Sequence, residues 1–245
     1  MNTTIFVLTI RQLLGRRRAF LMAAFGLLPI GAAVIFRMSA PNVDAQRWTV
    51  VVLLNGLVVT TLLPLVALVF GTSAMGGEIE DGTAVYLLSK PVPRWQVVIA
   101  KLLAAWLATS LLVGLSTVIS GIIAMNGAPQ DGIVIGFAIA MMLGALVYTA
   151  IFVLLSIVTS RALIAGLIYV FFWESVVTSI FSGTKIFSVR QYTLGVARLI
   201  STASTNTFDS RLDGNEALWL MAAVSALAIV LAVRRLQRFE IGEST

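Results

Sequence analysis

The side chains best suited to chemistry in this sequence are carboxylates and cations gathered in one short stretch, 76–101. Glu78 and Asp81 are three residues apart, so on a helix they would share one face and could hold a hard cation such as Mg²⁺ or Ca²⁺. Lys90 and Arg94 follow in the same stretch and counter a cation there. On charge alone, the stretch therefore favours a solvated turn over a metal site.

Two polar side chains stand inside long apolar runs. Glu174 is the one acidic residue well inside such a run, at 162–181, and Asn55 lies in another, at 49–73. An ionisable group in apolar surroundings is costly and by default indicates function. These two residues are therefore candidates for a polar site within the apolar part of the molecule.

Several classes of enzyme are excluded by composition. The chain has no Cys and no His, which removes disulfides, thiolate chemistry, imidazole metal sites and histidine-dependent triads. No Gly-x-x-x-x-Gly-Lys-Ser/Thr loop is present to bind nucleotide phosphates, and no two apolar runs carry the paired aspartates of an intramembrane aspartyl protease. We therefore expect a protein that is not an enzyme and that holds no cofactor or metal in this chain.

The elements that position these residues follow from hydropathy. Apolar residues make up 59% of the chain and charged residues only 11%, against roughly 45–50% and about 25% in soluble domains. Such a composition predicts an all-α membrane protein, with residues 1–245 forming one transmembrane domain. The sequence pI of about 10.3 does not indicate nucleic acid, because the basic residues flank apolar runs. Six transmembrane helices are expected, at about 19–36, 49–73, 102–125, 132–157, 162–181 and 217–233.

Flanking patterns refine this layout. Residues 5–14 alternate apolar with polar side chains before an arginine cluster, which indicates an interfacial helix or a cytoplasmic extension of the first span. That cluster resembles a twin-arginine export signal, but the first apolar run is longer than a signal core and further spans follow. Small residues every fourth position from Gly132 to Gly144 predict a ridge for close helix packing, within the protomer or in a dimer.

The distribution of cations predicts the orientation. Eleven of the 17 Lys and Arg residues fall in the compartments that hold both termini and the 76–101 stretch, and six fall in the others. Positive residues near span ends are retained in the cytoplasm. Both termini and the 76–101 stretch are therefore expected to be cytoplasmic. Gly82, Pro91 and Pro93 can break helices there, so a short helix hinged at both ends is expected between the second and third spans.

The order of residues in this stretch carries a resemblance. Glu78-x-Glu80-x-Gly82-Thr83, then Leu87-Leu88-Ser89-Lys90-Pro91-x-Pro93-Arg94, then Lys101, resembles the cytoplasmic loop signature of ABC exporter permeases of the second type. A weaker match lies at Tyr169, Trp173-Glu174 and Ser188-Val189-Arg190-Gln191-Tyr192. The resemblance includes the six-span layout and covers nearly the whole chain.

The resemblance implies a site and partners. The loop would form a coupling helix seated on a separate ABC ATPase subunit, which would hold the ATP and Mg²⁺, and the segment after the fifth span would dip back into the membrane from outside. A second copy of the permease, most simply an identical one, would complete the path in a multi-pass protein of the bacterial inner membrane. By resemblance, the residues at or near the coupling contact are Glu78, Asp81, Gly82, Thr83, Leu88, Lys90, Arg94 and Lys101.

Some alternatives stay open at this stage. The cargo is undefined, and drugs, lipids and other amphipathic molecules all fit. Glu174 could line the cargo path, pair with Arg190 or Arg198, or cap a re-entrant turn. A membrane scaffold that does not transport is the second candidate function, and an intramembrane enzyme is the third.

Overall fold

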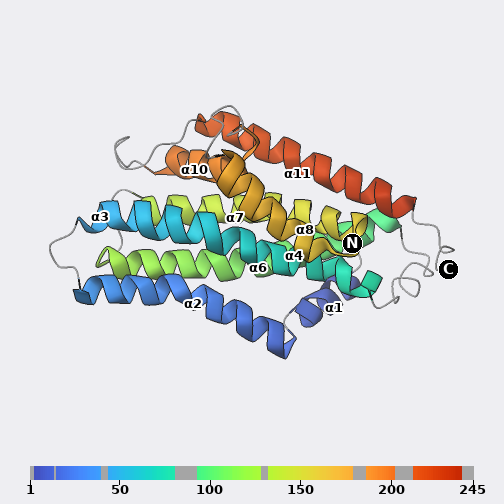
Figure 1. The fold of residues 1–245 in the computed structure, drawn as a ribbon, viewed down its shortest axis with the longest axis horizontal. Helices are drawn as coiled ribbons and strands as arrows, with labels where there is room; N and C mark the ends of the chain where they lie inside the picture. The colour runs from blue at the N-terminus through green and yellow to red at the C-terminus, as the bar shows by residue number, and fades with distance from the viewer. Residues whose placement is uncertain are drawn as a thin grey trace.

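The computed structural model describes residues 3–13, 15–39, 44–80, 93–127, 132–178, 186–201 and 212–238, and helices make up nearly all of these segments. Helical structure is what an apolar chain requires in lipid, where each backbone N–H and C=O must find its partner within the segment. The helices run side by side along the long axis of the molecule (Figure 1). Their bounds are α1 Thr3–Leu13, α2 Arg16–Ser39, α3 Ala45–Trp48, η1 Thr49–Leu62, α4 Leu63–Glu80, α6 Arg94–Ala124, α7 Ile133–Val158, α8 Ala162–Ile168, η2 Tyr169–Val177, α10 Val189–Ile200 and α11 Gly214–Gln237.

Five helical stretches of the described chain are long and apolar enough to cross a membrane. They contain the first to fourth and the sixth of the expected spans, at Phe20–Ser39, Ala45–Gly77, Arg94–Ala124, Ile133–Val158 and Gly214–Gln237. The expected fifth span corresponds to α8 and η2, whose apolar part, Ala162–Glu174, is shorter. The structure thus supports a multi-pass protein, with five spans where the sequence predicts six.

The helices extend beyond the apolar runs from which they were expected. The third expected span began at residue 102, whereas α6 begins at Arg94. Hydropathy indicates only which residues suit lipid. A helix can continue into polar surroundings as long as its backbone hydrogen bonds are made. Lys101, expected in the loop before this span, therefore lies inside a helix.

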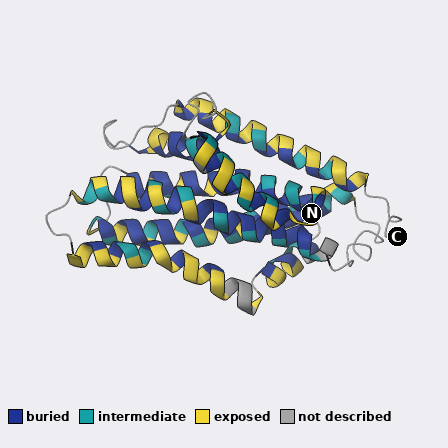
Figure 2. Ribbon diagram, in the orientation of Figure 1, coloured by how far each residue is buried: buried dark blue, intermediate teal, exposed yellow. Residues whose placement is uncertain are grey.

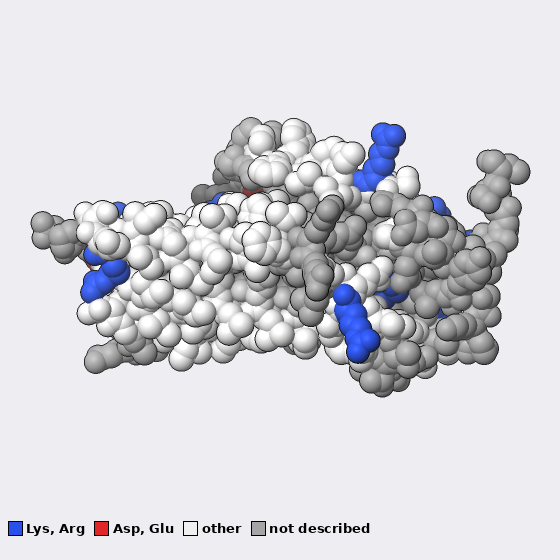
Figure 3. Space-filling model, turned by 90° about the horizontal axis from the view of Figure 1, so that it is seen from below, with Lys and Arg blue, Asp and Glu red and all other residues white. Residues whose placement is uncertain are grey.

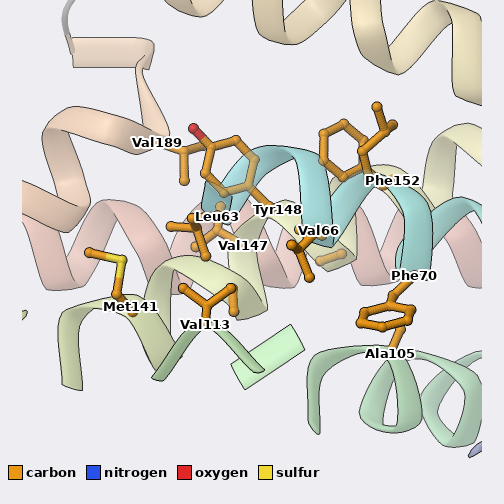
Figure 4. Close-up of a cluster of buried hydrophobic side chains, with 14 of the residues drawn as sticks. Leu63, Val66, Phe70, Ala105, Val113, Met141, Val147, Tyr148, Phe152 and Val189 are labelled. Atoms are coloured by element: carbon orange, nitrogen blue, oxygen red, sulfur yellow. The ribbon is translucent and has the colours of Figure 1, made fainter. Parts of the chain in front are cut away.

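Helix α7 is the centre of the bundle and packs against α4, α6, α10 and α11. Figure 4 shows the core that results, in which Tyr148 and Phe152 of α7 cluster with Leu63 and Val66 of α4, and Val189 of α10 lies beside Tyr148. Apolar residues have no net preference for one another over lipid tails, so close packing must hold this bundle together. Small residues at the helix contacts make that packing possible.

The predicted ridge of small residues on α7 packs inside the protomer, against α10. A Cβ added at Gly144 would lie 2.6 Å from Thr193 Oγ1, and one added at Gly136 would lie 3.2 Å from the carbonyl oxygen of Ala197. The ridge was expected to pack either within the protomer or in a dimer, and the structure shows packing within the protomer.

Helix α10 runs antiparallel to the first half of α7. Its last turn lies near Gly132, where a Cβ would be 4.0 Å from the carbonyl oxygen of Ile200, and Thr193 lies at Gly144. Its first residue, Val189, lies beside Tyr148, near the middle of α7 (Figure 4). The 12 residues of α10 therefore cover only half the length of a candidate span.

Two segments are wound as π-helices, in which backbone bonds reach back five residues. The N–H of Leu63 at the end of η1 bonds to the carbonyl of Val58, and the hydroxyl of Thr60 reaches the carbonyl of Asn55 at 2.7 Å. Pro64, which has no N–H, follows just after η1. π-Helical turns are rare and are frequent at functional sites. Pro64 thus lies next to a change of helix type, whereas Pro29 lies within the continuous helix α2.

Apolar side chains cover the outward faces of the bundle. Figure 2 shows exposed residues along α2 and α11, and these include Phe20, Met38 and Trp219, each at least 75% exposed. On the face in Figure 3, a broad surface without charged side chains separates the Lys and Arg side chains toward the two ends of the long axis. Such a surface suits lipid and would be unusual in water.

Candidate intramembrane polar site and loop base

The carboxylate of Glu174 accepts four hydrogen bonds in the interior of the bundle. The hydroxyl of Ser188 donates to Oε2 at 2.6 Å, and the backbone N–H of Val189 donates to Oε1 at 2.9 Å. The hydroxyls of Tyr148 and Tyr169 donate to Oε1 at 3.2 and 3.4 Å. Glu174 is 5% exposed, so these donors replace the water that a buried carboxylate loses.

Glu174 thereby caps the amino end of α10. Ser188 is the N-cap residue of that helix, and its Oγ also accepts from the N–H of Gln191 at 3.4 Å. The first N–H groups of a helix have no partner within it, and a negative charge there is favoured by the helix dipole. Of the three roles considered for Glu174, this contact matches the cap of the segment that follows η2.

Asn55 contacts the same helix turn from η1. Its side-chain oxygen accepts a hydrogen bond from Nη2 of Arg190 at 3.0 Å. The sequence singled out Asn55 and Glu174 separately, and the structure brings them to adjacent residues of α10. Both come from π-helical segments, which is the form of helix often found at such sites.

Tyr148 is a member of this cluster that sequence reasoning did not single out. It lies four residues after Gly144, so it continues the ridge of small residues on α7. A side chain at the next position of a ridge faces the same neighbouring helix. Extending that periodicity by one step would have placed the Tyr148 hydroxyl toward α10.

The loop residues predicted to contact an ATPase divide into two groups. Asp81, Gly82, Thr83, Leu88 and Lys90 lie outside the described residues. Glu78 belongs to the last turn of α4, but its side chain is not described. The hinged helix expected there, and the metal-site alternative for Glu78 and Asp81, therefore stay predictions.

Arg94 and Lys101 lie in the first turns of α6 and bind carbonyls of two other helices. Nη1 of Arg94 donates to the carbonyls of Leu236 and Gln237, at 2.6 and 2.8 Å, in the last turn of α11. The last carbonyls of a helix lack partners within it, and a cation there is favoured by the helix dipole. Nζ of Lys101, which is 1% exposed, donates to the carbonyl of Ala74 within α4 at 2.6 Å. The two cations therefore tie the start of α6 to α11 and α4.

A hollow in the described part of the bundle is apolar. A groove of about 380 Å³ lies between α1, α2, α4 and α6, lined by residues such as Ile10, Ala23, Phe70 and Leu111. Helix α1 contributes Ile10 to the lining and buries Ile5 and Leu13. Its lining has almost no polar surface, so the groove favours an apolar occupant such as an acyl chain.

Comparisons with known proteins agree with the resemblance seen in the sequence. The family model described as ABC-2 family transporter protein matches residues 6–238. A relative from Pseudomonas aeruginosa, named probable ABC transporter permease protein NosY, is 31% identical over 127 residues. That match covers 50% of this chain and 46% of the relative, so the chain spans about half the length of the curated relative that it matches.

Proposed function

Because this chain belongs to the ABC-2 family of transporter proteins, we propose that it is the transmembrane permease subunit of an ATP-driven exporter, with ATP and Mg²⁺ bound by a separate ATPase subunit. The family match over residues 6–238 carries this proposal. The absence of a phosphate-binding loop from the sequence supports the placement of hydrolysis on another chain. The cargo is an amphipathic molecule, such as a drug or a lipid.

The proposed topology has six spans, with α8 and η2 as part of the fifth. Both termini and the loop after α4 lie in the cytoplasm of a bacterial inner membrane, as the excess of Lys and Arg predicts. Helix α1 lies at the interface, and α10 is a re-entrant helix from the outer side. The position of Val189 beside Tyr148, halfway along α7, supports this half-depth placement.

The proposed coupling element is the loop between α4 and α6. The hydrogen bonds of Arg94 and Lys101 support it, because they fasten the first turns of α6 to the end of α11 and to α4. A displacement of the loop would therefore move α4, α6 and α11 together. Asp81, Gly82, Thr83, Leu88 and Lys90 are proposed to provide the contact with the ATPase, and Glu78 to lie beside it.

A second copy of this chain is proposed to complete the transport path, since homo-oligomers with two-fold symmetry are the commonest assemblies. The outward face of α8 and η2 supports such a contact. Ile164, Ile168, Phe171 and Phe172 on that face are each more than half exposed. This surface suits either lipid or another helix.

Coexpression with an ABC ATPase subunit of the source organism tests the proposal. We expect the two chains to copurify in detergent and the complex to hydrolyse ATP in proteoliposomes, with hydrolysis rising when a transported amphiphile is added. A complex that hydrolyses ATP but responds to no amphiphile would favour the scaffold. Failure of the two chains to associate would contradict the permease assignment.

A further inference from the structure

Arg190 is a charged side chain whose hydrogen-bonding capacity is largely unused. A guanidinium carries five N–H donors and is always protonated. Among the described residues, its side-chain hydrogen-bond partner is the neutral Asn55, and its Nε is buried without a partner. The donors to the neighbouring Glu174 carboxylate are Ser188, Tyr148, Tyr169 and the backbone of α10, and the Arg190 guanidinium is not among them.

The location of Arg190 makes this arrangement costly. Val189, the preceding residue, lies beside Tyr148 near the middle of the candidate span α7 (Figure 4). A cation at such a depth is expensive unless an anion or water compensates it. Arg190 is only half-buried, so part of the residue is accessible from outside the described residues. An external anion is therefore the partner that this geometry favours.

The surroundings define the rest of the ligand. Ile186 and Phe187 precede the α10 cap and are 49% and 65% exposed, and Val51 and Val52 on η1 are 42% and 50% exposed. These apolar side chains lie within one turn or a few residues of Asn55 and Arg190 along the chain. A ligand that places an anionic group on Arg190 would therefore contact apolar surface with the rest of its body.

We propose that Arg190 and Asn55 form a binding site for the anionic head of an amphipathic molecule, a phosphate or a carboxylate carried on a hydrocarbon chain. The guanidinium supplies charge and paired N–H donors, and the Asn55 amide holds it in place and supplies further donors. The site would be formed by this chain alone, so the binding test does not depend on the ATPase partner.

Native mass spectrometry of the full chain in dodecyl maltoside tests the site with four probes: phosphatidylglycerol, oleate, phosphatidylcholine and inorganic phosphate. We expect phosphatidylglycerol or oleate to bind and phosphatidylcholine to bind at least about tenfold more weakly, since its head carries no net charge. Comparison of phosphatidylglycerol with oleate distinguishes a phospholipid from a carboxylate ligand. Binding of inorganic phosphate as tight as that of the amphiphiles would overturn the amphipathic part of the proposal.

The decisive variant is Asn55→Asp, which changes one atom type and places a carboxylate 3.0 Å from the guanidinium. It supplies the missing anion from within the chain, so we expect anionic amphiphiles to bind about tenfold or more weakly while the melting temperature is kept or raised. Arg190→Gln should lose binding to a similar degree. Asn55→Asp decides the question if Arg190→Gln does not fold.

Arg198→Gln is the matched control, because it removes the same charge from an exposed position of the same helix. We expect it to bind the anionic probes as the wild type does. An equal loss of binding in Arg198→Gln would assign the effect to general surface charge. Unchanged binding in Asn55→Asp would show that the anionic head does not bind at Arg190 and Asn55. Either result would overturn the proposal.

Discussion

A single carboxylate organises the junction between η2 and α10. Among the described residues, the hydrogen-bond donors to Glu174 include Ser188, the N–H of Val189 and the two tyrosine hydroxyls. A carboxylate matches this set, because it has acceptor sites on both oxygens. The residue type at position 174 thus follows from the donors that face it.

The substitution Glu174→Gln tests that role. Its amide nitrogen would point an N–H toward one of these donors, so we expect a loss of about 1–3 kcal/mol in stability. The expected readout is a lower melting temperature in detergent, together with faster amide exchange in the first turn of α10. Glu216→Gln is the matched control, because it makes the same change at an exposed position in the first turn of α11. An unchanged melting temperature together with altered cargo handling would instead assign Glu174 to the transport path.

At the scale of the elements, the position of α10 depends on glycine residues of α7, which have no side chain at the contact. A Cβ added at Gly144 would approach Thr193 Oγ1 to 2.6 Å and Leu63 Cδ2 to 3.1 Å, from two different helices. Neither helix can retreat without losing packing elsewhere, since proteins are packed as densely as organic crystals.

We therefore expect Gly144→Ala to destabilise the protein by about 1–3 kcal/mol, the usual cost of overpacking. Gly114→Ala is the matched control: it lies within α6 with nothing within 4 Å of the new Cβ, and alanine favours a helix over glycine. Thermal unfolding of the two variants should differ in sign, with Gly114→Ala at or above the wild type. Equal melting temperatures would contradict the close approach of α10 to α7.

The long helices could be predicted from the sequence, but α10 could not. Runs of more than 18 apolar residues indicate spans, whereas α10 has 12 residues and depends on α7 for its place. The ridge from Gly132 to Gly144 predicted a packing surface without identifying what packs there. Asn55 and Glu174 were found as polar residues in apolar runs, but their meeting on α10 is a tertiary contact that no local pattern encodes. The fifth span stays a prediction, because its apolar helix is shorter than the other five.

At the scale of the whole molecule, the two ends of the bundle have different connections. The end that holds α1 and the last turn of α11 also holds the end of α4 and the start of α6 (Figure 1). There, Arg94 links α6 to the last carbonyls of α11. Nearer the other end, α10 is held to α7, η1 and η2 by close packing and by the polar cluster. A signal from the loop can therefore reach α10 through α11, which packs against both α6 and α10, as well as along α4 and η1.

The substitution Arg94→Gln tests this path in the complex with the ATPase. It removes the guanidinium that bonds two terminal carbonyls of α11, so the start of α6 and the end of α11 can move separately. In the wild-type complex, we expect ATP to change amide hydrogen exchange in α10. In Arg94→Gln, hydrolysis should continue while the ATP-dependent change in α10 falls severalfold, with a cost in stability of about 1–2 kcal/mol for the lost charge-assisted bonds. Arg161→Gln, which neutralises an exposed arginine between α7 and α8, should behave as the wild type. A full response of α10 to ATP in Arg94→Gln would show that coupling does not pass through the link between α6 and α11.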